Sequence, residues 1–323
     1  MPALTEELAG RLAAVMAGAL SAPVEVGGLE RLPGGASRQT WGFWTRAADG
    51  TRADWVLRMG RPGSSGLGKE PALLAAARAQ GVPVPSVVAA EEEPSRLGPA
   101  FMVLSRVPGE TIPRRILRDD LYARARPVMA GQCGQILARI HRIPPQAVAG
   151  LAGDADPLGS LVGVLDSLAQ PRPALELAIR WLDARRPPSS GQTVVHGDFR
   201  NGNLVVGPEG VRAVLDWELA HLGDPLEDLG WLCVKSWRFG EAAPVGGFGG
   251  YEQLLGAYEA EAGTRVDREA LRWWEVFGNL RWGVICIVQC MTHLSGAARS
   301  VELATIGRRV CEAEWDLLEL IGS

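Results

Sequence analysis

The pattern of hydrophobic and polar positions divides the chain into two parts of different character. Between Val24 and Arg61, apolar and polar residues alternate, which is typical of half-buried β-strands. Turn-forming residues interrupt the alternation, for example in the glycine-containing stretch LPGGASRQT. The pattern predicts an amphipathic helix at residues 3–20 and strands at about 24–32, 40–47 and 54–59.

A helical pattern follows at residues 68–80 and ends at Gly81. Short strands are then expected in the stretch PVPSVVAAEEE and over residues 101–104. From Asp119 onward, apolar residues recur with the helical period. Helices are expected at about 119–143, 173–186, 249–262, 267–290 and 300–319.

These patterns predict an α+β fold with two lobes. Residues 1–104 are expected to form a small antiparallel sheet with one helix, residues 105–109 a hinge, and residues 110–323 a larger, mostly helical lobe. Ligands usually bind in the cleft at such a junction. The glycine-rich segment at 240–250 is expected to be a mobile loop on the substrate side.

The composition is that of a folded globular protein, because 47% of its 323 residues are hydrophobic and 22% are charged. The formal net charge of −4 gives no reason to expect nucleic acid or an anionic membrane as a partner. Five cysteines without a CxxC pair indicate reduced thiols. No apolar run is long enough to span a membrane, and residues 1–20 do not read as a signal peptide, so a cytoplasmic location is expected.

The stretch VVHGDFRNGN, followed downstream by VLDW, carries the clearest chemistry. It places Asp198, Asn203 and Asp216 around a predicted strand–loop–strand segment. Phosphoryl transfer from ATP uses one carboxylate to orient or deprotonate the attacking hydroxyl, and an amide oxygen and a second carboxylate to hold metal ions. We therefore expect Asp198 to be the catalytic residue. Asn203 and Asp216 are expected to bind Mg²⁺, which prefers hard oxygen ligands.

This combination resembles the catalytic segment of the aminoglycoside/choline phosphotransferase-type kinases, a small-molecule branch of the protein-kinase-like superfamily. The resemblance spans most of the chain and implies a bilobal protein-kinase-like fold with an ATP-binding first lobe. The family's metal-binding Asp often lies within Ile/Leu-Asp-Trp-Glu, matched here by residues 215–218. GDPLEDLGWL resembles a further family segment, which implies that Asp228 supports the catalytic loop. His196 is expected to orient that loop rather than to act as a base.

The resemblance extends to the first lobe through shorter motifs. GGASRQT resembles the loop that covers the ATP phosphates, and FMVLSRVPGE resembles the hinge whose backbone reads adenine. WVLR resembles the strand with the phosphate-contacting cation, here Arg58 in place of the usual Lys, and Glu70 falls where the family has its partner Glu. Arg is not a neutral replacement for Lys, so the sequence leaves the Arg58–Glu70 pair open. The residues expected to bind ATP are Gly34, Gly35, Ser37, Arg58, Glu70, Ser105 and Val107.

Two other interpretations remain open at this point. Residues 63–69 fit GxxxxGK, the start of a P-loop, but Glu70 then occupies the position where Ser or Thr binds the metal ion. The second is a catalytically weak, nucleotide-binding pseudokinase or regulatory module, which Arg58 motivates. The intact set of Asp198, Asn203 and Asp216 argues against it.

The leading interpretation is an ATP- and Mg²⁺-dependent enzyme that transfers the γ-phosphate to a hydroxyl group of a small molecule. LDWELAHLGDPLEDLGWL looks most like the phosphotransferase domains associated with acyl-CoA dehydrogenases. On that resemblance, a hydroxyacyl-CoA or hydroxy acid is favoured over an aminoglycoside as the acceptor. The arginine-rich run at 114–126 suits an anionic acceptor, although a solvated helix face explains it more simply. The sequence leaves the oligomeric state open.

Overall fold

The computed structural model of the chain describes residues 2–32, 38–60 and 66–322. The chain separates into two compact units. The first unit comprises Met1–Gly109, Gln146–Gly150 and Arg212–Glu218, and the second comprises the remaining segments. The division at 105–109 stays a prediction, and the compact units differ from it because two short later segments join the first unit.

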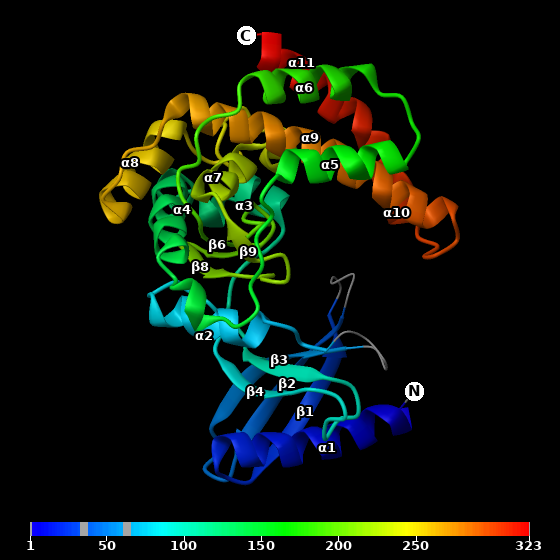
Figure 1. Ribbon diagram of the computed structural model, residues 1–323. Coiled ribbons are helices and arrows are strands. Elements are labelled where there is room, and N and C mark those ends of the chain that lie inside the picture. Colours follow the sequence, from blue (N-terminus) through cyan, green and yellow to red (C-terminus); the bar gives the residue numbers. More distant parts are fainter. Residues whose placement is uncertain (1, 33–37, 61–65, 323) are drawn as a thin grey trace. The chain divides into compact units, whose positions relative to one another are not determined.

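The first unit is built on a five-stranded sheet in the order β1-β2-β3-β5-β4 (Figure 1). Every neighbouring pair of strands is antiparallel, which confirms the predicted small antiparallel sheet. The apolar run at the start of β5 is buried on both faces, as expected for a strand near the middle of a sheet. The strands are β1 (Val24–Arg31), β2 (Gln39–Ala47), β3 (Arg52–Met59), β4 (Val87–Glu91) and β5 (Phe101–Ser105).

Helix α1 (Pro2–Leu20) covers one face of this sheet (Figure 1). Its residues Leu12, Val15 and Met16 are fully buried in a core to which the strands contribute Phe43 and Phe101. Each fully buried side chain of this size contributes about 1.5–3 kcal/mol. The apolar stripe of α1 and the inward-facing strand residues therefore stabilise each other.

Helix α2 (Glu70–Ala79) follows β3 in the chain and packs near β4. Its first turn contains a proline, whose missing N–H has no intrahelical partner at that position in any case. Gly81 follows the helix with a φ of 75°, a left-handed conformation that glycine adopts without strain. The predicted end of this helix at Gly81 agrees with its observed end.

The second unit is mostly helical, and its longest helix, α9 (Arg268–Leu294), is surrounded by others. Helices α4 (Arg126–His141) and α8 (Tyr251–Ala262) form a separate close pair. Gly134 makes this approach possible, because a Cβ atom there would lie 2.2 Å from the carbonyl oxygen of Leu254. The helices packed on α9 are α5 (Pro157–Ser167), α6 (Pro173–Ala184), α7 (Pro225–Cys233), α10 (Val301–Ile306) and α11 (Val310–Gly322).

The predicted helix at 119–143 is divided in the structure. Within that range the chain forms a 3₁₀ turn (Asp120–Tyr122) and then α4, and the short helix α3 (Pro113–Arg118) precedes the range. Pro127 lies in the first turn of α4, where a proline is tolerated, whereas in a helix interior it would break the hydrogen-bond ladder. Proline therefore sets the start of α4 after the predicted start.

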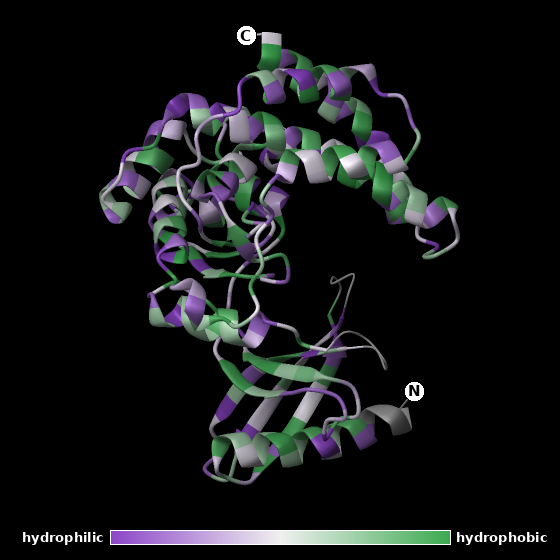
Figure 2. Cartoon of the chain, in the orientation of Figure 1, coloured by the Kyte–Doolittle hydropathy of each residue, from purple (hydrophilic) through white to green (hydrophobic). Residues whose placement is uncertain are grey.

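The second half of the glycine-rich segment at 240–250 is packed, and the mobility of the segment and its place on the substrate side stay predictions. Residues 245–249 are buried, and Val245 pairs with Gly249 in an isolated antiparallel bridge. The N–H of Gly246 also donates to the carbonyl of Leu232. Figure 2 shows hydrophobic residues both on the strands of the first unit and along α9.

Candidate active site

Asp198 lies in a loop between two short strands of the second unit. Strand β6 (Thr193–Val195) precedes the loop and pairs antiparallel with β9 (His221–Gly223). Strand β7 (Leu204–Gly207) follows the loop and forms a two-stranded sheet with β8 (Gly210–Val214). The expected strand–loop–strand arrangement is therefore present.

Gly197 shapes the turn that presents Asp198. Its φ of 76° lies in the left-handed region, and a Cβ atom there would lie 2.5 Å from the carbonyl oxygen of Leu219. Side chains other than hydrogen are therefore excluded by both the backbone conformation and the available space. This explains the glycine between His196 and Asp198.

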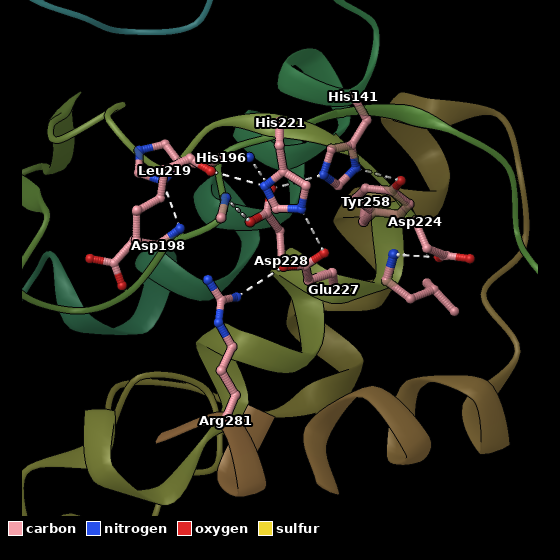
Figure 3. Close-up of polar contacts among 12 residues, drawn as sticks. His141, His196, Asp198, Leu219, His221, Asp224, Glu227, Asp228, Tyr258 and Arg281 are labelled. Carbon is pink, nitrogen blue, oxygen red and sulfur yellow. Dashed lines mark hydrogen bonds and ion pairs between the residues drawn. The ribbon is translucent and has the colours of Figure 1, made fainter. Parts of the chain in front are cut away.

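Asp228, on α7, holds the backbone of this loop. Its fully buried carboxylate accepts the N–H groups of His196, at 2.7 Å, and of Gly197, at 2.9 Å (Figure 3). Nε2 of His141 lies 3.2 Å from the same carboxylate, and Nδ1 of His141 lies 2.9 Å from the Tyr258 hydroxyl. Burial alone would raise the pKa of Asp228, but the His141 hydrogen bond and the neighbouring histidine charges lower it below the ordinary value. The loop is thus anchored on a buried carboxylate.

His196 is itself fully buried within the loop. The N–H of Asp198 donates to its Nδ1 at 3.2 Å, and its ring packs edge-on against Phe199. These contacts fix the ring between two residues of the loop. Its role as a support rather than a base stays a prediction.

Three side chains donate hydrogen bonds to the carboxylate of Asp198. Oδ1 accepts from Nε1 of Trp231, at 2.9 Å, and from Nε of Arg200, at 3.0 Å. Oδ2 accepts from Nδ2 of Asn203 at 2.7 Å, and the same amide donates to the Asp198 carbonyl at 2.9 Å. The side chain of Asp198 is 15% exposed. The carboxylate is therefore held in one orientation while part of it stays accessible.

Asp216, the second predicted metal ligand, belongs to the first unit. Its φ of 65° is uncommon for a residue other than glycine and carries an energetic cost, which makes it a candidate for a functional position. Oδ1 of Asp216 lies 3.6 Å from Nη2 of Arg58. The oxygen chemistry of Asp216 and Asn203 fits Mg²⁺. In the described part of the chain, no group of three or more His, Cys, Asp and Glu residues could hold a metal ion by itself.

Arg58, on β3, forms an ion pair with Glu70 at the start of α2. The pair that the sequence left open is therefore present. Arg38 donates to the other carboxylate oxygen of Glu70 and also donates to the carbonyl of Leu67 at 2.9 Å. The Glu70 side chain is only 2% exposed, so two guanidinium groups neutralise one buried carboxylate.

The structure adds little on the remaining residues that are expected to bind ATP. Gly34, Gly35 and Ser37 lie outside the described residues. Ser105, at the end of β5, uses its N–H and its hydroxyl in hydrogen bonds with the backbone of Ser86, both at 2.9 Å. Val107 follows β5 and is partly buried. An adenine contact at Ser105 through its N–H would have to replace an existing bond.

The contacts of Glu70 bear directly on the P-loop interpretation. Glu70 occupies the position that a P-loop needs for Ser or Thr, and its carboxylate is engaged by Arg38 and Arg58. With this carboxylate already bound by two arginines, the start of α2 offers no Ser or Thr hydroxyl to a metal ion. These contacts therefore disfavour a P-loop.

Sequence reasoning missed Arg38, Arg200 and Trp231 as site residues. Arg200 stands two residues after Asp198, and Trp231 stands three residues after Asp228, so both lay within segments already singled out. On a helix, residues three apart share a face, which was the available signal for Trp231. Arg38 lies within GGASRQT, which was also singled out, but nothing in that motif distinguished it as a partner of Glu70.

A second polar cluster lies beside the loop. Nε2 of His221 lies 3.1 Å from Glu227, which also accepts from Nη1 of Arg281 at 2.9 Å (Figure 3). Burial lowers the pKa of His221, but the hydrogen bond and charge of Glu227 outweigh it and raise the pKa to about 9. His221 is therefore protonated at neutral pH.

A protein-family profile and known protein sequences match the chain. The profile described as "Phosphotransferase enzyme family" matches residues 28–274. Mouse acyl-CoA dehydrogenase family member 10 is 34% identical over 182 residues, which cover 54% of this chain and 17% of that protein. The matched segment therefore covers less than a fifth of the length of the mouse protein.

Solved structures share the fold. A Ralstonia eutropha protein, provisionally described as an aminoglycoside phosphotransferase, superposes with a TM-score of 0.73 at 21% identity, covering 97% of this chain and 98% of that one. A thermostable mutant of aminoglycoside phosphotransferase APH(4)-Ia, solved with AMP-PNP and hygromycin B, has a TM-score of 0.55 at 19% identity, covering 92% and 94%. These similarities confirm the kinase-like phosphotransferase fold. Among the described helices, none is both long enough and apolar enough to cross a lipid bilayer.

Proposed function

The chain belongs to the phosphotransferase enzyme family, and on this premise we propose that it transfers the γ-phosphoryl group of ATP to a hydroxyl group of a small molecule. Asp198 is the catalytic residue in this proposal. Its carboxylate accepts a hydrogen bond from the acceptor hydroxyl, orients that oxygen toward the phosphorus and receives its proton as the new P–O bond forms and the bond to ADP breaks.

The observation that carries the proposal is the fixed carboxylate of Asp198. Trp231, Arg200 and Asn203 all donate to it, at 2.7 to 3.0 Å, and it remains 15% exposed. Phosphoryl transfer depends mainly on positioning and on charge stabilisation, and a carboxylate held in one orientation supplies positioning.

The loop support is part of the same proposal. Asp228 accepts the N–H groups of the two residues that precede Asp198, and His196 accepts the Asp198 N–H. We propose that Asp228 and His196 set the backbone of the loop and take no direct part in proton transfer. The full burial of both residues supports this division of roles.

The nucleotide is assigned to the first unit. The Arg58–Glu70 pair supports a phosphate contact by Arg58, since a cation held by a buried carboxylate is preorganised for an anion. Gly34, Gly35, Ser37, Ser105 and Val107 remain proposed ATP contacts on the sequence resemblance. The solved complex of a fold relative with AMP-PNP agrees with the use of ATP.

Mg²⁺ is the proposed metal ion, with Asn203 and Asp216 as its protein ligands. When bound, it would neutralise charge on the ATP phosphates. The strained backbone of Asp216 supports a functional role for its carboxylate. Asn203 also holds Asp198 through its amide N–H₂, which leaves the amide oxygen as its ligand atom.

For the acceptor, we propose a hydroxyacyl-CoA or related hydroxy acid rather than an aminoglycoside. The support for this choice is the sequence match to a mouse protein named as an acyl-CoA dehydrogenase family member. The arginines near Asp198 do not add to it, because Arg200 is paired with the Asp198 carboxylate and Arg281 with Glu227.

The test is Mg²⁺-dependent consumption of ATP by the purified protein, with acceptors supplied in three pools. These are hydroxyacyl-CoAs and hydroxy acids, amino alcohols and sugars, and aminoglycosides. We expect turnover with the first pool and its loss in Asp198→Ala, with ATP affinity largely kept. Turnover that survives Asp198→Ala would refute the catalytic assignment, and ATP binding without turnover in any pool would favour the pseudokinase.

A further inference from the structure

Trp231 is a buried residue of α7 that reaches the Asp198 carboxylate from 33 positions further along the chain. Its side chain is almost fully buried, and its indole Nε1 donates to Oδ1 of Asp198 at 2.9 Å. An indole N–H can only donate, so the bond has one possible direction. A rigid aromatic donor therefore fixes one oxygen of the carboxylate.

Two side chains of helix α7 contact the loop that carries Asp198. Asp228 and Trp231 are three residues apart and share a face of this helix. Asp228 accepts the backbone N–H groups of His196 and Gly197, while Trp231 donates to the side chain of Asp198. One helix thus sets both the backbone of the loop and the direction of its carboxylate.

Trp231 is itself held by its neighbours. Its ring lies 5.2 Å from that of Trp237, and the Arg281 guanidinium stacks over it at 4.9 Å. Arg281 is in turn fixed by Glu227 at 2.9 Å. Aromatic pairs and stacked cations of this kind restrict rotation of the ring, so the indole has little freedom to turn.

Arg200, only two residues after Asp198, contacts the same carboxylate oxygen. Its Nε donates to Oδ1 of Asp198 at 3.0 Å, and its guanidinium stacks over Trp237 at 4.6 Å. Gly202 leaves room for it, since a Cβ atom at Gly202 would lie 2.6 Å from Nη1 of Arg200. Trp237 is therefore a shared platform for Trp231 and Arg200.

We propose that Trp231 and Arg200 are positioning residues that fix the orientation of the Asp198 carboxylate, with Trp237 as the platform that holds both. This inference rests on the proposed catalytic role of Asp198. Without the two donors, Oδ1 loses both side-chain hydrogen bonds and the carboxylate can rotate away from the acceptor hydroxyl. The reaction then slows while ATP binding is unaffected.

The main test compares two Trp→Phe variants. Trp231→Phe removes the donor to Asp198 and keeps an aromatic ring. Trp273→Phe is the matched control, because Trp273 is also buried and its Nε1 donates to the Leu182 carbonyl at 2.8 Å, without a contact to the loop. Melting temperature, kcat and KM for ATP are measured for both, with 3-hydroxybutyryl-CoA as acceptor and, without acceptor, as ATP hydrolysis.

We expect the two variants to lose similar thermal stability. Trp231→Phe should lower kcat about 10- to 100-fold with KM for ATP within about twofold, and Trp273→Phe should keep kcat. Equal kcat values in the two variants would overturn the inference. Arg200→Lys, which keeps the charge but loses the Nε donor, should behave as Trp231→Phe does.

Asp198→Ala separates this inference from the proposed function. If Asp198→Ala is active, the catalytic assignment itself fails. If Asp198→Ala is inactive and Trp231→Phe is fully active, only the positioning role fails.

A spectroscopic measurement tests the contact without any turnover. The chain has 11 tryptophans, and the indole N–H signal of Trp231 is the one missing from the ¹H–¹⁵N spectrum of Trp231→Phe. In Asp198→Ala this signal should move upfield, because the indole loses its charged acceptor, while the Trp273 signal stays in place. An unmoved Trp231 signal would overturn the inference.

Discussion

Arg58 and Glu70 form an ion pair between β3 and α2, although the chain carries Arg where the wider kinase superfamily usually has Lys. Glu70 is almost completely buried and receives Arg38 on its other oxygen. The replacement of Lys by Arg therefore preserves the pair. Because the pair is present, Arg58 no longer gives a reason to regard the chain as a pseudokinase.

Removal of Glu70 should destabilise the protein strongly. Glu70→Ala leaves two largely buried guanidinium groups without their carboxylate, so we expect a loss of about 3 kcal/mol in the free energy of unfolding, measured by urea. Glu25→Ala is the control, since the exposed Glu25–Arg46 pair, at 3.6 Å, should contribute less than about 1 kcal/mol. Equal losses would contradict the interpretation of Glu70.

Gly197→Ala should lower the free energy of unfolding by more than the left-handed backbone conformation alone explains. The variant adds a left-handed non-glycine residue, at about 1–2 kcal/mol, and a Cβ clash with the Leu219 carbonyl. Gly50→Ala isolates the first cost, because Gly50 has a φ of 85° and a Cβ atom added there would meet no other atom within 4 Å. Chemical unfolding should rank Gly197→Ala clearly below Gly50→Ala in stability, and a reversed order would refute the close approach.

Asp228→Asn should loosen the catalytic loop. An amide in place of the carboxylate can accept fewer of the N–H donors from His196, Gly197 and His141, so we expect a loss of about 2–4 kcal/mol and a lower kcat. Asp166→Asn, on the exposed face of α5, should stay within about 0.5 kcal/mol of the parent. If both variants unfold at the same urea concentration, the buried carboxylate does not anchor the loop.

Stability should fall with rising pH through the titration of His221. Its folded pKa of about 9 lies above the ordinary value of 6.5, so its contribution is complete below about pH 6.5 and is lost as the pH rises through about 9. We expect a decrease of about 1–3 kcal/mol in the free energy of unfolding over this window. His221→Gln should flatten that decrease, and an unchanged pH profile in the variant would exclude His221 as its source.

Local signals in the sequence predicted most elements, and the elements they missed had recognisable starts. Helices α5 and α7 were not expected, yet each begins with Asp-Pro, at Asp156 and Asp224. In both, the aspartate side chain accepts a backbone N–H of the first turn and proline occupies that turn. The information was present in these residues, whereas the division of the helix at 119–143 required attention to Pro127.

The sequence by itself determined the fold class and indicated which groups we propose to react. Alternation with period two specifies the sheet, the helical period specifies the second unit, and the spacing of Asp198, Asn203 and Asp216 indicates phosphoryl transfer. Only the tertiary structure decided which side chains hold those groups. Trp231 meets Asp198 across 33 residues and Arg38 meets Glu70 across 32, and such contacts depend on how helices and strands pack, which no local pattern encodes.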